Sequence, residues 1–159
     1  AAVGIGTTLL LHCDLVYAAD NARFQLPFVN LALCPEGASS LLLPRVAGYQ
    51  RAAELLLLGE PFDAATARDA GFVNRVLPAG ELMATALDVA RKLATRPAAS
   101  LAVTKALMKR PPERSAIEAI DEEVIYFGDL VAAPAAKEIF AAFLEKRPPD
   151  PDKIHGNKK

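Results

Sequence analysis

Glu36 is the residue whose type and surroundings are best suited to chemistry. It is a carboxylate within an apolar stretch that includes Leu31, Leu33 and Cys34. Withdrawal from water favours the neutral form of a carboxyl group, which makes such a group a competent proton acceptor and donor. A plainer interpretation is a charge near a helix start, stabilised by the helix dipole. The residues alone favour the plainer interpretation.

The turn Gly4-Ile5-Gly6 is a second candidate because it precedes a predicted helix. Backbone N–H groups at a turn that opens a helix can bind negative charge, and Ile5 and Gly6 are the candidate donors. The turn lacks the third glycine, the βαβ unit and the acidic residue of a dinucleotide-binding fingerprint. Taken alone, it is more typical of a structural strand-to-helix turn.

The histidines and serines have plainer interpretations. His12 lies among leucines, which is typical of a hydrogen-bonded core histidine, and His155 lies in the charged tail. Neither has a metal-binding partner at a useful spacing, so we predict no metal site. Ser39 and Ser40 lack the strand-turn-helix setting of an activated nucleophile and should form local hydrogen bonds at a helix start.

Composition excludes several classes of function. The 18 basic and 19 acidic residues leave a net charge of −1, so there is no broad positive surface for nucleic acid.

Cys13 and Cys34 follow neither metal-ligand nor disulfide spacing, and we expect reduced thiols packed as small apolar groups. This favours a cytoplasmic or organelle-matrix location rather than secretion. The apolar runs are too short to span a membrane, and the opening residues suggest the middle of a domain.

Elements that would position these residues follow from turn residues and apolar periodicity. In the first part of the chain we expect strands over 15–18, 22–26 and 72–77. We expect a short buried helix over 7–13 and a helix that opens near Glu36. Two further helices are expected, one over 49–58 ended by Gly59 and one over 64–70 capped by Asp63.

The rest of the chain is predicted to be largely helical. We expect helices over 81–95, from Pro97 to about 110, from a Ser115 cap to about 130, and from Pro134 to 147. The proline-rich, charged tail, 148–159, is expected to be disordered. The domain prediction is therefore a core over 1–95, a helical region over 96–147, and the tail.

A series of short motifs gives the chain a family resemblance. It resembles the enoyl-CoA hydratase/isomerase (crotonase) superfamily in the order and spacing of segments that run nearly to the tail. These are Gly4 to Asp14, Phe24-Gln25-Leu26-Pro27, Pro35-Glu36-Gly37, Leu43-Pro44-Arg45, Gly48, Ala53-Glu54-Leu55, Gly71-Phe72-Val73-Asn74, Leu101 to Lys105, and Phe140 to Arg147.

The resemblance implies the C-terminal part of an α/β fold, a spiral of ββα units followed by a helical trimerisation region. It also implies reactions through a thioester enolate, held by two backbone N–H groups. One of these carries over to Ile5, within the Gly4–Gly6 turn that would contact substrate. The other belongs to an earlier segment that this chain does not contain.

The resemblance also bears on the reaction. Hydratases of the family use two glutamates, and the corresponding positions here hold Thr8 and Phe28. Neither side chain can activate water as a carboxylate would. Glu36 instead matches the single base of the peroxisomal-type 3-enoyl-CoA to 2-enoyl-CoA isomerases, in the context Pro-Glu-Gly-x-Ser-Ser. The implied activity is an isomerase in which Glu36 moves a proton and Phe28 belongs to an apolar wall.

The implied partners are an acyl-CoA substrate and further copies of the chain, as a homotrimer or a dimer of trimers. No cofactor is implied beyond the CoA of the substrate. Phe127 and Lys146 match positions that contact CoA, and a lysine suits a phosphate. Two alternatives remain: another acyl-CoA reaction of the superfamily, such as that of a hydratase, dehydratase, hydrolase or dienoyl-CoA isomerase, and a truncated, non-catalytic subunit.

Overall fold

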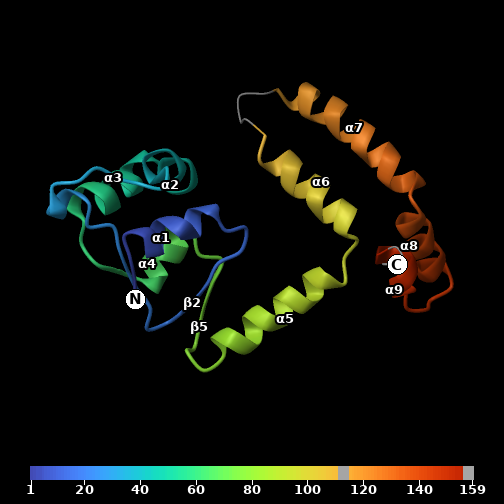
Figure 1. Ribbon diagram of the computed structural model, residues 1–159, viewed down its shortest axis with the longest axis horizontal. Helices are drawn as coiled ribbons and strands as arrows, with labels where there is room; N and C mark the ends of the chain where they lie inside the picture. The colour runs from blue at the N-terminus through green and yellow to red at the C-terminus, as the bar shows by residue number, and fades with distance from the viewer. Residues whose placement is uncertain (111–114, 156–159) are drawn as a thin grey trace. The chain divides into compact units, whose positions relative to one another are not determined.

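The computed structural model describes residues 1–110 and 115–155 of the chain. These residues form two compact units, Ala1–Leu87 and Asp88–Lys159, and the division falls within helix α5 (Leu82–Ala94). The first unit is mixed α/β and the second is helical (Figure 1). Among the described residues, no helix is both long and apolar enough to cross a membrane.

Short strands of unit 1 form two small sheets. The first has the order β1-β3-β4, with β1 parallel to β3 and β3 antiparallel to β4. The second pairs β2 with β5 in parallel. The strands are β1 (Ala2–Val3), β2 (Tyr17–Ala19), β3 (Arg23–Gln25), β4 (Phe62–Asp63) and β5 (Arg75–Leu77). The predicted strands over 15–18, 22–26 and 72–77 are thus present but shorter or shifted, because the paired backbone is confined to these few residues.

Helices of unit 1 begin and end where local signals place them. Asp63 accepts a hydrogen bond from the Thr66 N–H at 2.8 Å, which confirms the predicted cap of α4. Gly59, at φ +61°, confirms the predicted end of α3. The helices are α1 (Ile5–Thr8), α2 (Ser39–Ala47), α3 (Tyr49–Leu58) and α4 (Ala64–Asp69), with 3-10 turns η1 (Leu9–His12) and η2 (Val29–Leu31). The predicted helix over 7–13 is therefore α1 followed by a tighter 3-10 turn.

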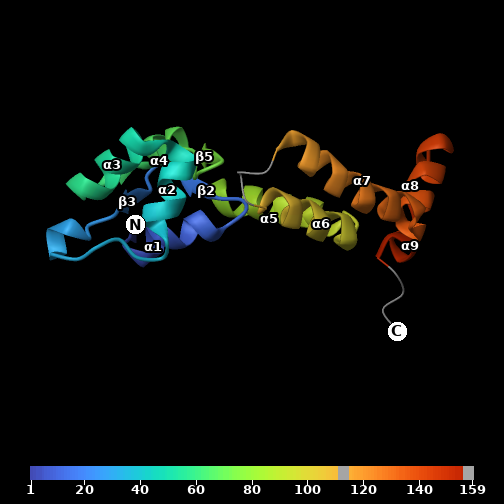
Figure 2. The same ribbon diagram turned by 90° about the horizontal axis from the view of Figure 1, so that it is seen from above.

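The core of unit 1 is built around three phenylalanines. Phe24 and Phe62 stack with ring centroids 5.7 Å apart, and Phe72 meets both rings edge-on at 6.0 and 6.2 Å. Edge-on and stacked arrangements are the favourable geometries for aromatic pairs. Helices α2 and α3 lie against one another in both views (Figures 1 and 2). Helix α2 buries Leu43 in this core, and α3 buries Leu55 and Leu56.

Unit 2 contains, besides the end of α5, the helices α6 (Ala98–Met108), α7 (Ala116–Ala132), α8 (Pro134–Leu144) and α9 (Pro151–His155). Ser115 and Glu118 form the capping box that opens α7, and Pro134 occupies the first turn of α8, as predicted. Figures 1 and 2 show α6 and α7 side by side within this unit.

Residues 151–155, which belong to the tail that composition predicted to be disordered, form helix α9. Residues 156–159 of the tail lie outside the described residues. The buried carboxylate of Glu138 on α8 accepts hydrogen bonds from Arg147 at 2.6 Å and from the Asp150 N–H at 2.9 Å. Lys153 lies 3.4 Å from the same carboxylate. These bonds attach the segment after α8 to the helix, which composition alone did not reveal.

Candidate active site

The glycine turn joins β1 directly to α1. The Gly4 N–H donates to the Gln25 carbonyl at 3.0 Å, and the Gly4 carbonyl accepts from the N–H groups of Thr7 and Thr8 at 2.9 and 3.0 Å. Gly4 has φ +55°, a backbone conformation that favours glycine. Ile5 is therefore the first helical residue, and its N–H belongs to the turn whose donors have no carbonyl partner within the helix.

Two buried threonines follow this turn. Thr7 donates to the carbonyls of Ala2 at 2.6 Å and Gln25 at 3.2 Å, which ties α1 to the sheet. Thr8, with no exposed surface, donates to Oε1 of Glu36 at 2.6 Å. The Thr8 hydroxyl also lies 3.4 Å from the carbonyl of Ile5. The helix that carries the Ile5 N–H thus also contacts the candidate base.

The loop around Glu36 has an unusual backbone. Ala32, Gly37 and Ala38 have φ values of +57°, +60° and +56°, and such conformations are costly for alanine. The Gly37 carbonyl lies 2.8 Å from Nε2 of His12. The Ser39 N–H and hydroxyl donate to the Glu36 carbonyl at 3.1 and 2.7 Å, the local bonding predicted for this serine. Hydrogen bonds from two directions therefore fix the loop.

One prediction about this region is confirmed and two need correction. Helix α2 begins at Ser39, three residues after Glu36, so Glu36 lies near a helix start as predicted. Glu36 is exposed, and so are the apolar side chains expected to desolvate it, Leu31 and Leu33. Both cysteines are free but exposed rather than packed in the core. The apolar neighbours of Glu36 in sequence therefore do not desolvate it, because they are themselves exposed.

His12 also differs from its prediction. Its ring is hydrogen-bonded, as expected, but it is exposed and faces the loop instead of the core. Neither this contact nor the one from Thr8 to Glu36 was inferred from sequence. The partners are 25 and 28 residues apart, so no local pattern links them.

Phe28 lies in the core of unit 1 and is buried. Its carbonyl accepts from the N–H groups of Leu31 at 3.0 Å and Leu33 at 2.8 Å, which shapes the start of the loop that leads to Glu36. Gly6 lies in α1, and a Cβ added there would meet only the Ala2 Cβ at 3.7 Å. The structure therefore places Gly4, Ile5 and Gly6 in one turn, and Phe28 in the core at the start of the loop that leads to Glu36.

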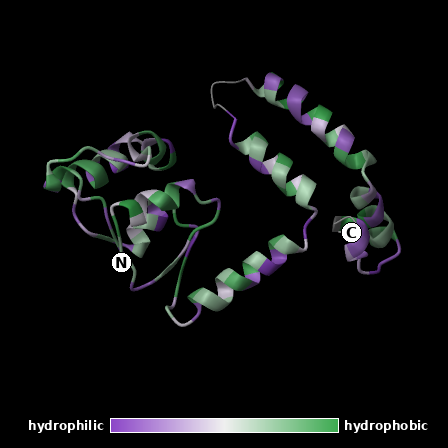
Figure 3. Cartoon of the chain, in the orientation of Figure 1, coloured by the Kyte–Doolittle hydropathy of each residue, from purple (hydrophilic) through white to green (hydrophobic). Residues whose placement is uncertain are grey.

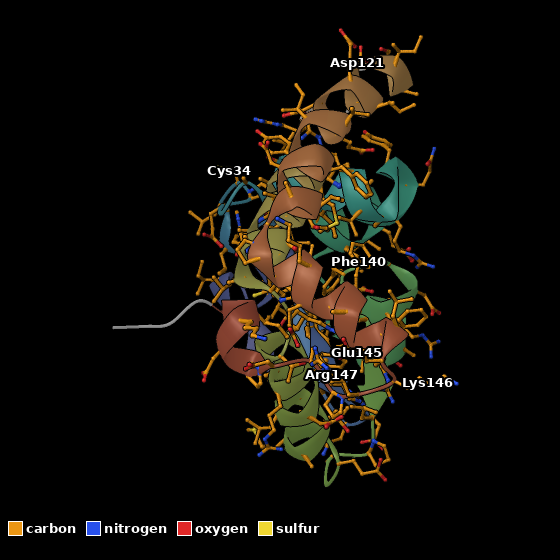
Figure 4. All side chains as sticks on the ribbon, turned by 90° about the vertical axis from the view of Figure 1, so that its right-hand side faces the viewer. Cys34, Asp121, Phe140, Glu145, Lys146 and Arg147 are labelled. Atoms are coloured by element: carbon orange, nitrogen blue, oxygen red, sulfur yellow. The ribbon has the colours of Figure 1, made fainter. Side chains whose placement is uncertain are left out.

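Phe127 and Lys146 lie in unit 2. The Phe127 side chain is 71% exposed on α7 and lines an apolar groove of about 490 Å³ together with Leu130 and Phe140. Lys146 follows α8 with φ +53°, and its side chain points away from the helices (Figure 4). Its neighbour Arg147 instead turns to Glu138 and Glu145. Within the described residues, no cluster of three or more His, Cys, Asp or Glu residues could hold a metal ion.

The sequence model of the family described as enoyl-CoA hydratase/isomerase matches residues 1–153. The chain belongs to this family. In structure it is similar to a protein of Magnetospirillum magneticum AMB-1 that is provisionally named an enoyl-CoA hydratase/carnithine racemase. The TM-score is 0.89 with 48% identity, over 94% of this chain and 59% of the other. The crotonase-like α/β fold expected from the sequence is thereby confirmed.

Curated relatives carry names from more than one reaction class. The chain is 34% identical to 2,3-dehydroadipyl-CoA hydratase of Escherichia coli (strain K12), over 94% of this chain and 58% of the relative. It is 36% identical to 1,2-epoxyphenylacetyl-CoA isomerase of the same organism, over 93% and 56%. The chain thus spans somewhat more than half the length of the relatives it matches.

Proposed function

We propose that this chain carries the proton-transferring part of an acyl-CoA isomerase that shifts a 3-enoyl-CoA double bond to the 2-position. In this mechanism the Glu36 carboxylate removes a proton from the carbon alpha to the thioester. The electron pair of the broken C–H bond delocalises into a dienolate, whose oxygen the Ile5 N–H helps to hold. Glu36 then returns the proton to the gamma carbon, so protons and electrons balance without added water.

The observation that carries this proposal is the hydrogen bond between Thr8 and Glu36. It brings a single carboxylate to the helix that begins at Ile5. The two positions at which hydratases of the family have glutamates hold Thr8 and Phe28, both buried. One carboxylate suffices for a 1,3-proton shift, whereas hydration needs a group that activates water. The apolar side chain of Phe28 suits an intermediate that water must not reach.

The second candidate is another acyl-CoA reaction of the family, hydration above all. The names of the relatives favour it, because a hydratase is among them at nearly the same identity as an isomerase. Hydration would require a water-activating group other than the side chains at positions 8 and 28. The two candidates therefore differ in the substrate that the wild-type protein would convert, a 3-enoyl-CoA for isomerisation or a 2-enoyl-CoA for hydration.

Recognition of CoA and assembly belong to the same proposal. Lys146 is exposed after α8 and offers a point charge to a phosphate, and Phe127 offers an exposed ring on α7. We infer that both contact the CoA portion of the substrate in a homotrimer or a dimer of trimers. No cofactor is required, because the CoA is part of the substrate.

A coupled assay for conversion of 3-hexenoyl-CoA to 2-hexenoyl-CoA tests the proposal. We would assay this chain alone and fused behind the N-terminal segment of a relative, each as wild type, Glu36→Gln and Glu81→Gln. Glu36→Gln should reduce kcat at least about 100-fold, because the amide cannot accept the proton. Glu81→Gln, an exposed glutamate in unit 1, is the matched control and should retain activity.

The same proteins should be tested for hydration of 2-hexenoyl-CoA. Hydration that survives Glu36→Gln, without isomerisation, would support the second candidate and contradict the proposal. No turnover of either substrate by the wild-type fusion would favour a non-catalytic subunit.

A further inference from the structure

Glu36 combines an exposed position with one strong hydrogen bond. A glutamate side chain at a surface samples several rotamers, and holding it in one of them costs conformational entropy. The Thr8 hydroxyl reaches Oε1 at 2.6 Å, the length expected of a hydroxyl bonded to a charged carboxylate. Within residues 1–110 and 115–155, the second oxygen, Oε2, accepts no hydrogen bond. The two carboxylate oxygens are therefore not equivalent.

The donor is held rigidly. Thr8 has no exposed surface and is β-branched, which restricts its χ1 angle. The loop also packs closely over it: a Cβ added at Gly37 would lie 3.1 Å from Oγ1 and 3.3 Å from Cβ of Thr8. His12, on the turn that continues α1, contacts the Gly37 carbonyl. The helix and the loop therefore approach through contacts that leave the hydroxyl little freedom.

We propose that Thr8 is a positioning residue that fixes the Glu36 carboxylate by holding Oε1, so that Oε2 carries the proton between the alpha and gamma carbons. This inference rests on the proposed isomerase function and deepens it. A base that serves two carbons in turn must reach both from one place, which rewards a fixed carboxylate. Thr8 occupies the position of a hydratase glutamate, but it acts through Glu36 and not on water.

Kinetics of Thr8→Val and Thr8→Ser in the isomerase assay test this inference. Valine keeps the shape of threonine and removes the hydroxyl, whereas serine keeps the hydroxyl and removes a methyl group. Because hydrogen bonds to charged groups are worth about 1.5–3 kcal/mol, Thr8→Val should lower kcat about 10- to 100-fold. KM should stay within about twofold, since substrate binding is untouched. Thr8→Ser should keep most of the wild-type kcat.

Thermal unfolding of each variant establishes that it is folded. If Thr8→Val does not fold, Thr8→Ala, which cannot overfill the site, replaces it. Wild-type kcat in the variant without the hydroxyl would overturn the inference. So would an equal loss in Thr8→Ser, because the effect would then come from packing.

Glu36→Gln in the same assay separates the two proposals. Loss of activity in Glu36→Gln with full activity in Thr8→Val would leave the proposed function standing and remove the role of Thr8. Full activity in Glu36→Gln, or no isomerisation by the wild-type protein, would overturn the proposed function and the role of Thr8 with it.

Discussion

At the scale of residues, α1 and the 3-10 turn η1 that follows it provide side-chain contacts to the Glu36 loop as well as the Ile5 N–H. Thr8 holds the carboxylate of Glu36, and His12 contacts the backbone of the next residue, Gly37. These contacts oppose the strain of a loop with two alanines in the left-handed region. The position of the candidate base therefore depends on contacts that α1 and η1 make with the loop.

Replacement of His12 should weaken this arrangement less than replacement of Thr8. We expect His12→Leu to lower kcat about 2- to 10-fold, because it removes a hydrogen bond to a backbone carbonyl and leaves the carboxylate contact intact. His12→Gln is the matched control, since its amide nitrogen can occupy the place of Nε2. Steady-state kinetics of both variants provide the measurement, and an equal loss in the two would contradict the role of this bond.

At the scale of elements, a buried carboxylate attaches α9 to α8. The hydrogen bond from Arg147 and, after it, the bond from the Asp150 N–H lower the pKa of Glu138 from its ordinary 4.5 to about 2. The same hydrogen bond to Glu138 raises the pKa of Arg147 above its ordinary value. The ionised pair holds the segment that composition predicted to be disordered.

Stability of this attachment should depend on pH in one direction. The folded-state pKa of Glu138 is depressed, so its contribution is fully present above about pH 4.5 and is lost as pH falls through about 2. Amide hydrogen exchange of α9 between pH 6 and pH 2 should show the loss. Glu138→Gln should expose α9 already at pH 6, with little further change on acidification. Glu123→Gln, an exposed glutamate on α7, should behave as wild type.

For the whole molecule, the second unit is notable for the apolar surface on its helices. Hydrophobic and hydrophilic residues alternate along α7 and α8 (Figure 3). Phe127, Phe140 and Phe143 are exposed, the last at 80%. Phe127 and Phe140 line the same apolar groove, and exposed apolar side chains of this kind are typical of interaction sites, which accords with the proposed trimer.

Assembly through these helices gives a prediction for Phe143. We expect Phe143→Asp to lower the molar mass in sedimentation equilibrium from that of a trimer to that of a monomer, because a charge would be buried unpaired at the interface. Lys137→Glu on the same helix is the control and should leave the mass unchanged. A wild-type monomer, or a trimer that tolerates Phe143→Asp, would show that this surface does not mediate assembly.

Helix caps, helix ends and the family could be predicted from the sequence. The caps at Asp63 and Ser115 and the helix starts and ends at Pro134 and Gly59 were predicted correctly. Each depends on hydrogen bonds or backbone angles within about four residues, which the residue types largely decide. The family could also be predicted, because the order and spacing of its motifs are visible in the sequence without the fold.

Only the tertiary structure decided the surroundings of Glu36. Its exposure, its hydrogen bond to Thr8 and the attachment of α9 through Glu138 depend on segments that meet after folding. The apolar neighbours of Glu36 in sequence suggested burial, but Leu31, Leu33 and Glu36 itself are exposed in the folded chain. Long-range contacts of this kind depend on the path of the whole chain, and no short pattern of residue types specifies that path.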